Sequence, residues 1–190
     1  VAVGQQALQA NTTASSNTAV GYQALYSNTT GGDNTAVGYQ AGYSNTTQGN
    51  NAFLGTRAGY STNATRSTFI GYEAGKNVTG IGNTMIGSSA GQGASGSTGT
   101  HNIAIGPWYD GSQEGPLSAF TTGSRNIAMG YGSLKFLTTG SDNVAIGQTT
   151  GQGVTTGSAN VLIGGGSTPA ANTNSYEIVI GVNATGKGSN

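Results

Sequence analysis

Short apolar stretches that end in glycine recur at regular distances along the chain, with polar stretches of Gly, Ser, Thr and Asn between them. Eight of the eleven have the form Asn, any residue, a small or apolar residue, an aliphatic residue, Gly, as in Asn17 to Gly21. Variant copies end at Gly4, Gly71 and Gly181. The intervals between successive anchor glycines are 17, 17, 17, 16, 16, 19, 24, 17, 17 and 17 residues. A fixed period of this kind is typical of stacked repeats. The anchor glycines are Gly4, Gly21, Gly38, Gly55, Gly71, Gly87, Gly106, Gly130, Gly147, Gly164 and Gly181.

The period predicts an all-β fold. No stretch has a helical hydrophobic period, so we expect essentially no helix. Seventeen residues are too few for a three-sided turn with long strands and favour a flat rung of two short β-like stretches. We therefore predict a parallel β-roll or β-solenoid of about ten 17-residue rungs, forming one repeat domain over residues 1–190. At ~4.8 Å per rung, the rod would be on the order of 50 Å long. Because the chain begins inside a repeat, at Val1, we expect it to belong to a longer polypeptide.

Three anchor positions have a physical interpretation. The residue before the glycine is always Val, Leu, Ile or Met, and we expect this column to form an aliphatic spine inside the rod. The glycine permits a positive φ or a close backbone approach. The leading asparagines either form a ladder of stacked side-chain amides or serve simply as turn residues. They are Asn17, Asn34, Asn51, Asn83, Asn102, Asn126, Asn143 and Asn160.

The position before the aliphatic column is apolar as well, for example Ala19, Ala36, Phe53 and Phe69. Neighbouring residues of a strand point to opposite faces, so both faces of this strand are apolar. A strand of that kind is covered on both sides. One cover is the interior of the rung, and a thin rod has no helices to supply the other. We therefore expect the chain to associate in parallel with copies of itself.

Composition narrows the function further. Charged residues make up 6% of the chain and the formal net charge is zero, so we expect no nucleic-acid partner. No run of about 18 apolar residues is present, and we expect no membrane insertion. Abundant Gly and Ser with few charges could indicate a disordered linker, but 34% hydrophobic residues at regular positions favour an ordered fold. The chain contains no cysteine, which excludes disulfides and thiolate metal sites.

The 24-residue interval between Gly106 and Gly130 predicts an insertion loop at residues 107–119. Insertions in solenoids form loops on one face, often the binding face. Trp108 and Tyr109 could stack on a sugar ring, and Asp110 and Glu114 could accept hydrogen bonds from its hydroxyls, so these four are our candidate ligand-binding residues. The alternative is that Trp108 packs on an irregular rung or on a neighbouring chain.

We expect no enzymatic activity, no cofactor and no metal site. Asp110 and Glu114 are the only close pair of carboxylates, the minimum for glycoside hydrolysis, but a Gly-rich loop gives them no rigid support. His101 is the only histidine, and the glycines from Gly91 to Gly99 lack the lysine of a phosphate-binding loop.

Tyrosines recur in two phases of the repeat. One phase holds Tyr22, Tyr39 and Tyr72, and the other holds Tyr26, Tyr43 and Tyr60. Pointing outward, they would form an aromatic stripe for glycans or for lateral fibre contacts. Pointing inward or half-buried, they would belong to the core of an oligomer.

The segments Asn17 to Leu25 and Asn34 to Gly42 resemble the head repeats of trimeric autotransporter adhesins. They are even more similar to the repeat tracts of phage tail fibres that end in an endosialidase-type intramolecular chaperone. The resemblance covers almost the whole chain, although the chaperone itself is not within these 190 residues. It implies a left-handed parallel β-roll, a homotrimer, and a location on a virion or otherwise at a cell surface.

From this resemblance we expect a structural segment of a phage tail fibre that attaches to a host-surface glycan. The alternative is the stalk or head of a bacterial trimeric adhesin. An ice-binding β-solenoid is less favoured, because the threonine column that follows the anchor asparagine at Thr18 and Thr35 becomes aliphatic at Ile103 and Ile127.

Overall fold

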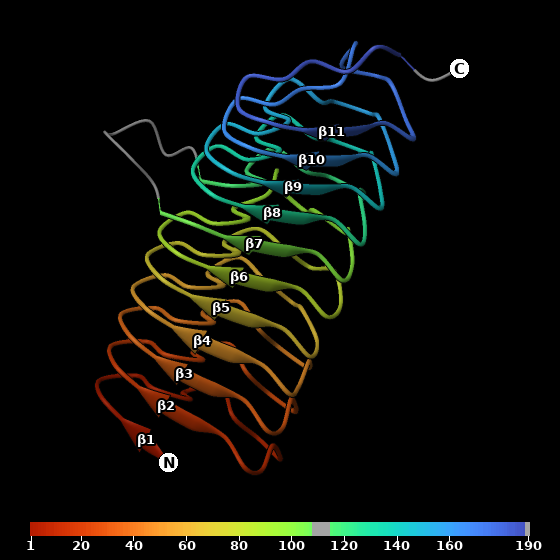
Figure 1. Ribbon diagram of the computed structural model, residues 1–190. Helices are drawn as coiled ribbons and strands as arrows, with labels where there is room; N and C mark the ends of the chain where they lie inside the picture. The colour runs from red at the N-terminus through yellow and green to blue at the C-terminus, as the bar shows by residue number, and fades with distance from the viewer. Residues whose placement is uncertain (108–114, 189–190) are drawn as a thin grey trace.

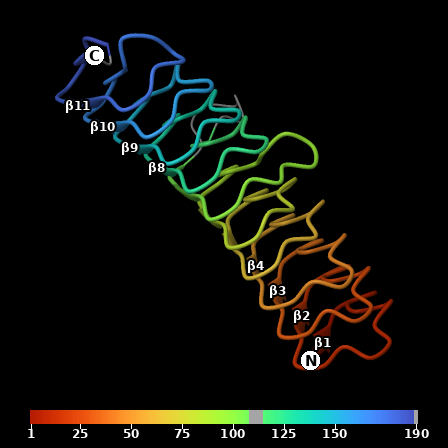
Figure 2. The same cartoon turned by 90° about the vertical axis from the view of Figure 1, so that its right-hand side faces the viewer.

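The computed structural model describes residues 1–107 and 115–188 of the chain. These residues form a rod of stacked rungs, with the parallel strands β1 to β11 along one side (Figures 1 and 2). The predicted all-β parallel solenoid of about ten turns is confirmed, and the described residues contain no helix. The strands are β1 (Ala2–Val3), β2 (Thr18–Val20), β3 (Thr35–Val37), β4 (Ala52–Leu54), β5 (Thr68–Ile70), β6 (Thr84–Ile86), β7 (Ile103–Ile105), β8 (Ile127–Met129), β9 (Val144–Ile146), β10 (Val161–Ile163) and β11 (Ile178–Ile180).

Strand register is constant although the intervals vary. Phe53 on β4 pairs with Phe69 on β5 across a 16-residue interval. Ile103 on β7 pairs with Ile127 on β8 across the 24-residue interval. Extra or missing residues are therefore absorbed outside the strands, so the sheet continues without a slip.

Within residues 1–107 and 115–188, each rung has one strand, not the two that we expected. The second side consists of turns in which left-handed residues interrupt the extended backbone, such as Gln23 (φ 54°) and Leu25 (φ 50°). Backbone bonds still join neighbouring rungs there, because the N–H of Leu25 donates to the carbonyl of Ala41 at 3.0 Å. Stacking thus needs aligned peptide groups on this side, but not strand geometry.

The interior of the rod is lined by the middle residue of each strand. Ala19 and Phe53 are fully buried, whereas the aliphatic residues beside them, such as Val37 and Ile146, are 40% and 39% exposed. Our prediction of an aliphatic spine inside the rod is therefore wrong. The two columns alternate in direction, and the opposite wall of turns lies so close that the interior column is mostly alanine. The larger aliphatic residues lie on the outer face of the sheet.

Size complementarity fills this narrow interior. Around the large side chain of Phe53 the opposite wall has glycine: a Cβ at Gly59 would lie 2.7 Å from the Phe53 ring, and one at Gly42 would lie 2.5 Å from it. In the rung of β2, Ala19 is matched instead by fully buried Leu25. The large interior side chain therefore comes from the strand in some rungs and from the turn in others.

The asparagine ladder is confirmed. In the middle of the ladder, the Oδ1 atom of Asn126 accepts from the N–H of Asn143 at 3.0 Å, and its Nδ2 donates to the carbonyl of Gly140 at 2.9 Å. Ser67 replaces asparagine in one rung, where its hydroxyl accepts from the N–H of Asn83 at 3.2 Å. Each member therefore joins its rung to the neighbouring rung through otherwise unpaired buried peptide groups.

The anchor glycine is required by close stacking. Gly21 has φ 132°, and a Cβ there would lie 2.4 Å from the carbonyl oxygen of Gly38 in the next rung. Only glycine fits both the conformation and the contact.

At the predicted insertion, the regular rung resumes at Gly115. The N–H of Leu117 donates to the carbonyl of Ser133 at 2.9 Å, as its counterpart does in other rungs, and the side chain of Leu117 is fully buried. The carbonyl of Pro116 accepts from the N–H of Gly91 at 2.9 Å on the other side. The residues from Gly115 to Ala119 thus belong to the stack of rungs.

Candidate functional site

The four candidate ligand-binding residues of the insertion, Trp108, Tyr109, Asp110 and Glu114, lie outside the described residues. Our prediction of a binding loop there stays a prediction.

The outer face of the sheet is an exposed apolar surface. Strands β1 to β11 contain no charged residue. One column on this face is between 36% and 40% exposed at six positions, and these are Val37, Leu54, Ile70, Met129, Ile146 and Ile163. Beside it runs the column that is Thr18 and Thr35 in the first half of the rod and Ile127 and Val144 in the second. The face therefore becomes apolar in both columns toward the C-terminal half.

The tyrosines form two outward columns of stacked rings. Tyr22 and Tyr39 stack with centroids 5.4 Å apart. Tyr26, Tyr43 and Tyr60 stack in series at 5.1 and 5.2 Å. None of them lies in the interior of its own chain, and the second column is half-buried. That the tyrosines belong to the core of an oligomer stays a prediction.

Burial raises the pKa of Tyr43, and the neighbouring hydroxyls of Tyr26 and Tyr60 raise it further. Inside each column the rings cover one another's faces. The stacked part of a column therefore presents ring edges and hydroxyl groups to solvent.

A cluster of ion pairs surrounds one buried carboxylate, at the repeat position that follows Tyr72. Glu73 is 2% exposed, and its Oε1 is 2.7 Å from Nη1 of Arg57. Its Oε2 accepts from Nζ of Lys76 and from Nε2 of Gln92, both at 3.1 Å. The guanidinium of Arg57 also lies over the ring of Tyr60, 4.6 Å from its centroid. Both carboxylate oxygens are therefore occupied, and Glu73 joins adjacent rungs.

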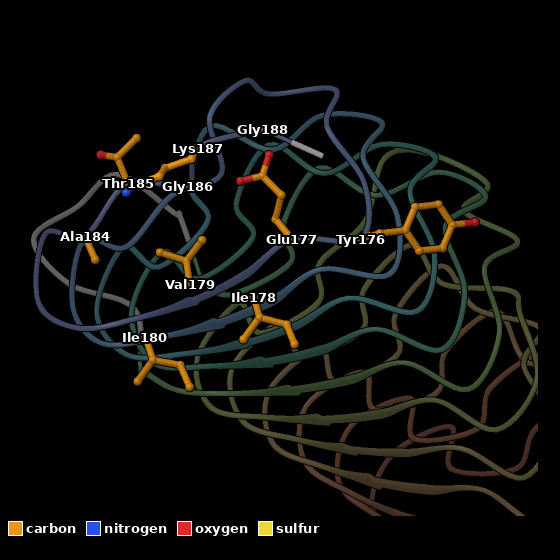
Figure 3. Close-up of a pocket in the computed structure, with 10 residues that line it drawn as sticks. All are labelled: Tyr176, Glu177, Ile178, Val179, Ile180, Ala184, Thr185, Gly186, Lys187 and Gly188. Carbon is orange, nitrogen blue, oxygen red and sulfur yellow. The ribbon is translucent and has the colours of Figure 1, made fainter. Parts of the chain in front are cut away.

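A hollow of about 460 Å³ lies at the last rung, against β11 (Figure 3). The side chains of Glu177 and Val179 point to its side of the strand, whereas Ile178 and Ile180 point to the other side. The carboxylate of Glu177 accepts from Nδ2 of Asn174 at 2.6 Å. The hollow is the interior of the rod seen at its end, and its one carboxylate is engaged in holding the turn.

Two kinds of feature are absent from residues 1–107 and 115–188. No three or more His, Cys, Asp or Glu side chains gather where they could hold a metal ion. Nor does this part of the chain form a helix long and apolar enough to cross a membrane.

Sequence reasoning missed the cluster around Glu73. The charges at Arg57, Glu73 and Lys76 were visible, and the first two share a repeat position with the glutamines Gln23 and Gln40. That shared phase was the signal that the charges would lie on adjacent rungs.

Comparison of the chain with protein-family models, with curated proteins and with solved structures found no significant match.

Proposed function

We propose that this chain is a structural segment of a trimeric phage tail fibre, which holds surfaces for host-glycan attachment away from the particle. A stack of rungs joined by backbone bonds and an amide ladder suits a stiff spacer. The resemblance of the repeats at Asn17 to Leu25 and Asn34 to Gly42 to tail-fibre repeats supports the same assignment.

The observation that carries the proposal is the uncovered apolar face of the sheet. A contiguous exposed apolar surface marks sites of protein association. Complete burial of an aliphatic side chain contributes about 1.5–3 kcal/mol, so burying the remaining 40% of each would add about 0.6–1.2 kcal/mol per residue. With no charge on the face, copies meet without repulsion. Three parallel rods can direct this face toward one axis, and closed symmetry leaves no apolar face uncovered.

Light scattering of the purified chain without denaturant tests the assembly. We expect a mass near three times 18.7 kDa. Ile146→Glu combined with Ile163→Glu places charges on the face and should give monomers. Thr156→Glu is the matched control, since Thr156 is exposed but lies on a turn, and it should remain trimeric. A monomeric unmodified chain would contradict the proposal.

The flanking sequence of the full-length gene tests the phage assignment. A self-cleaving intramolecular chaperone after the repeats would support it. A membrane-anchor domain would contradict it and assign the same rod to a bacterial adhesin.

A further inference from the structure

The residues that follow the anchor glycines form one outward column on the rod. Tyr22, Tyr39, Thr56 and Tyr72 are successive members. Their backbones are stacked rung upon rung: the carbonyl of Tyr39 accepts from the N–H of Arg57 at 2.8 Å, and the carbonyl of Thr56 accepts from the N–H of Glu73 at 3.0 Å. The column is therefore a ladder of tyrosines with one ring missing, at Thr56.

The missing ring leaves an open slot. Tyr39 stacks on Tyr22 on one side only, and no ring within the described residues stacks on Tyr72. At ~4.8 Å per rung, Tyr39 and Tyr72 are about 10 Å apart along the rod. Both are exposed, at 48% and 42%, and Thr56 between them is exposed as well. The slot thus has two aromatic walls and a short polar side chain at its base.

The neighbouring charges do not occupy this slot. The guanidinium of Arg57 is held by Glu73 and lies over the ring of Tyr60, in the other tyrosine column. That cation covers the last ring of the column formed by Tyr26, Tyr43 and Tyr60. The sides of Tyr39 and Tyr72 that face Thr56 are therefore both available to a ligand.

We propose that the slot between Tyr39 and Tyr72, with Thr56 at its base, binds a single pyranose ring of a surface glycan. This inference rests on the proposed function, because it names the ligand class and a place for the attachment. The face of an aromatic ring carries negative charge and attracts the C–H groups of a sugar's apolar face. The hydroxyls of Thr56 and of the two tyrosines can exchange hydrogen bonds with the sugar's rim.

The slot has the width of a single ring. In the neighbouring column, Tyr43 lies between Tyr26 and Tyr60 with centroid distances of 5.1 and 5.2 Å. One pyranose ring therefore fits between Tyr39 and Tyr72, and its hydroxyl rim, not the width of the slot, distinguishes it from a planar apolar ring.

Saturation-transfer NMR on the full chain tests the slot. The probes are the methyl glycosides of galactose, N-acetylglucosamine, fucose and N-acetylneuraminic acid at millimolar concentration, together with phenol as a planar probe. We expect saturation of the ring C–H protons of at least one sugar. Thr56→Tyr, which supplies the missing ring, should abolish the signal, and Tyr72→Leu, which removes a wall, should weaken binding at least tenfold. Tyr22→Leu, in the same column but outside the slot, is the matched control and should bind normally.

Thermal unfolding of Thr56→Tyr, with a midpoint equal to or above that of the unmodified chain, verifies that the fold is intact. The proposal is overturned if none of the four sugars is saturated, if the signal survives Thr56→Tyr, or if phenol displaces the sugar. A trimeric mass without sugar binding would contradict the sugar-binding slot and leave the fibre proposal standing. A monomeric mass together with sugar binding that Thr56→Tyr abolishes would contradict the fibre proposal and support the slot.

Discussion

In several rungs a strand residue and a residue of the opposite turn share the interior, one of them large and the other small. In the rung of β2 the pair is Ala19 and Leu25, both fully buried. In the rung of β4 it is Phe53 and Gly59, and a Cβ at Gly59 would lie 2.7 Å from the phenylalanine ring. Alanine plus leucine has nearly the same volume as phenylalanine plus glycine. Phe53→Ala together with Gly59→Leu should therefore rebuild the core of the β2 rung inside the β4 rung.

The single changes should be costly. Phe53→Ala leaves a cavity and should lower the free energy of unfolding by about 3–5 kcal/mol. Gly59→Leu overpacks the core, which costs about 1–3 kcal/mol, and places a side chain in the left-handed region, which costs about 1–2 kcal/mol. The backbone itself accepts leucine there, since Leu25 has φ 50° and Gly59 has φ 58°. Added together, the two changes would cost about 5–10 kcal/mol, whereas the double variant should retain only the conformational cost of about 1–2 kcal/mol.

Urea unfolding followed by circular dichroism, at one fixed protein concentration, measures these differences. Phe53→Ala with Gly151→Leu is the matched control. Gly151 has the same αL turn conformation, but it faces Leu162 and Leu134 several rungs away, so its effect should add to that of Phe53→Ala. If the Phe53→Ala, Gly59→Leu variant is as unstable as this control, volume exchange within a rung is not what determines the core.

Three further predictions concern the backbone stack, the amide ladder and the tyrosine column. Gly21→Ala should lower the free energy of unfolding by about 3 kcal/mol, because its Cβ would meet the Gly38 carbonyl at 2.4 Å. Gly96→Ala, with φ 73° and no atom within 4 Å, should cost only about 1 kcal/mol in the same urea titration, and equal losses would contradict the contact. Asn126→Ala should cost about 3 kcal/mol by leaving the Asn143 N–H and the Gly140 carbonyl unpaired, and Asn126→Ser, which imitates Ser67, should recover part of that loss. Tyr26→Phe with Tyr60→Phe should lower the pKa of Tyr43, seen in the ultraviolet titration of tyrosinate, and an unchanged titration would contradict a contribution from these two hydroxyls. Since the folded chain raises this pKa, the associated stability is complete below the ordinary tyrosine pKa of about 10 and is lost as the pH rises through the raised value.

The spacing of Gly21, Gly38 and Gly55 was enough to predict a parallel stack and its number of rungs. Each rung needs one glycine whose backbone lies too close to the next rung to leave room for a Cβ. The spacing of these glycines therefore equals the length of a rung. The asparagine column was readable for the same reason, since each Asn pairs with its counterpart one rung away. These features depend on residues in the same phase of neighbouring repeats, and a sequence displays phase directly.

The tertiary structure decided which apolar column faces inward. Ala36 and Val37 are both apolar, and alternation places them on opposite faces without saying which face is enclosed. The wall of turns lies close behind the sheet and leaves room for Ala36, so Val37 lies outside on the surface that we propose to be the trimer interface. The slot at Thr56 arises in the same way. Its threonine reads as an ordinary variation in a repeat, and it becomes a site only because stacking places Tyr39 and Tyr72 on either side of it.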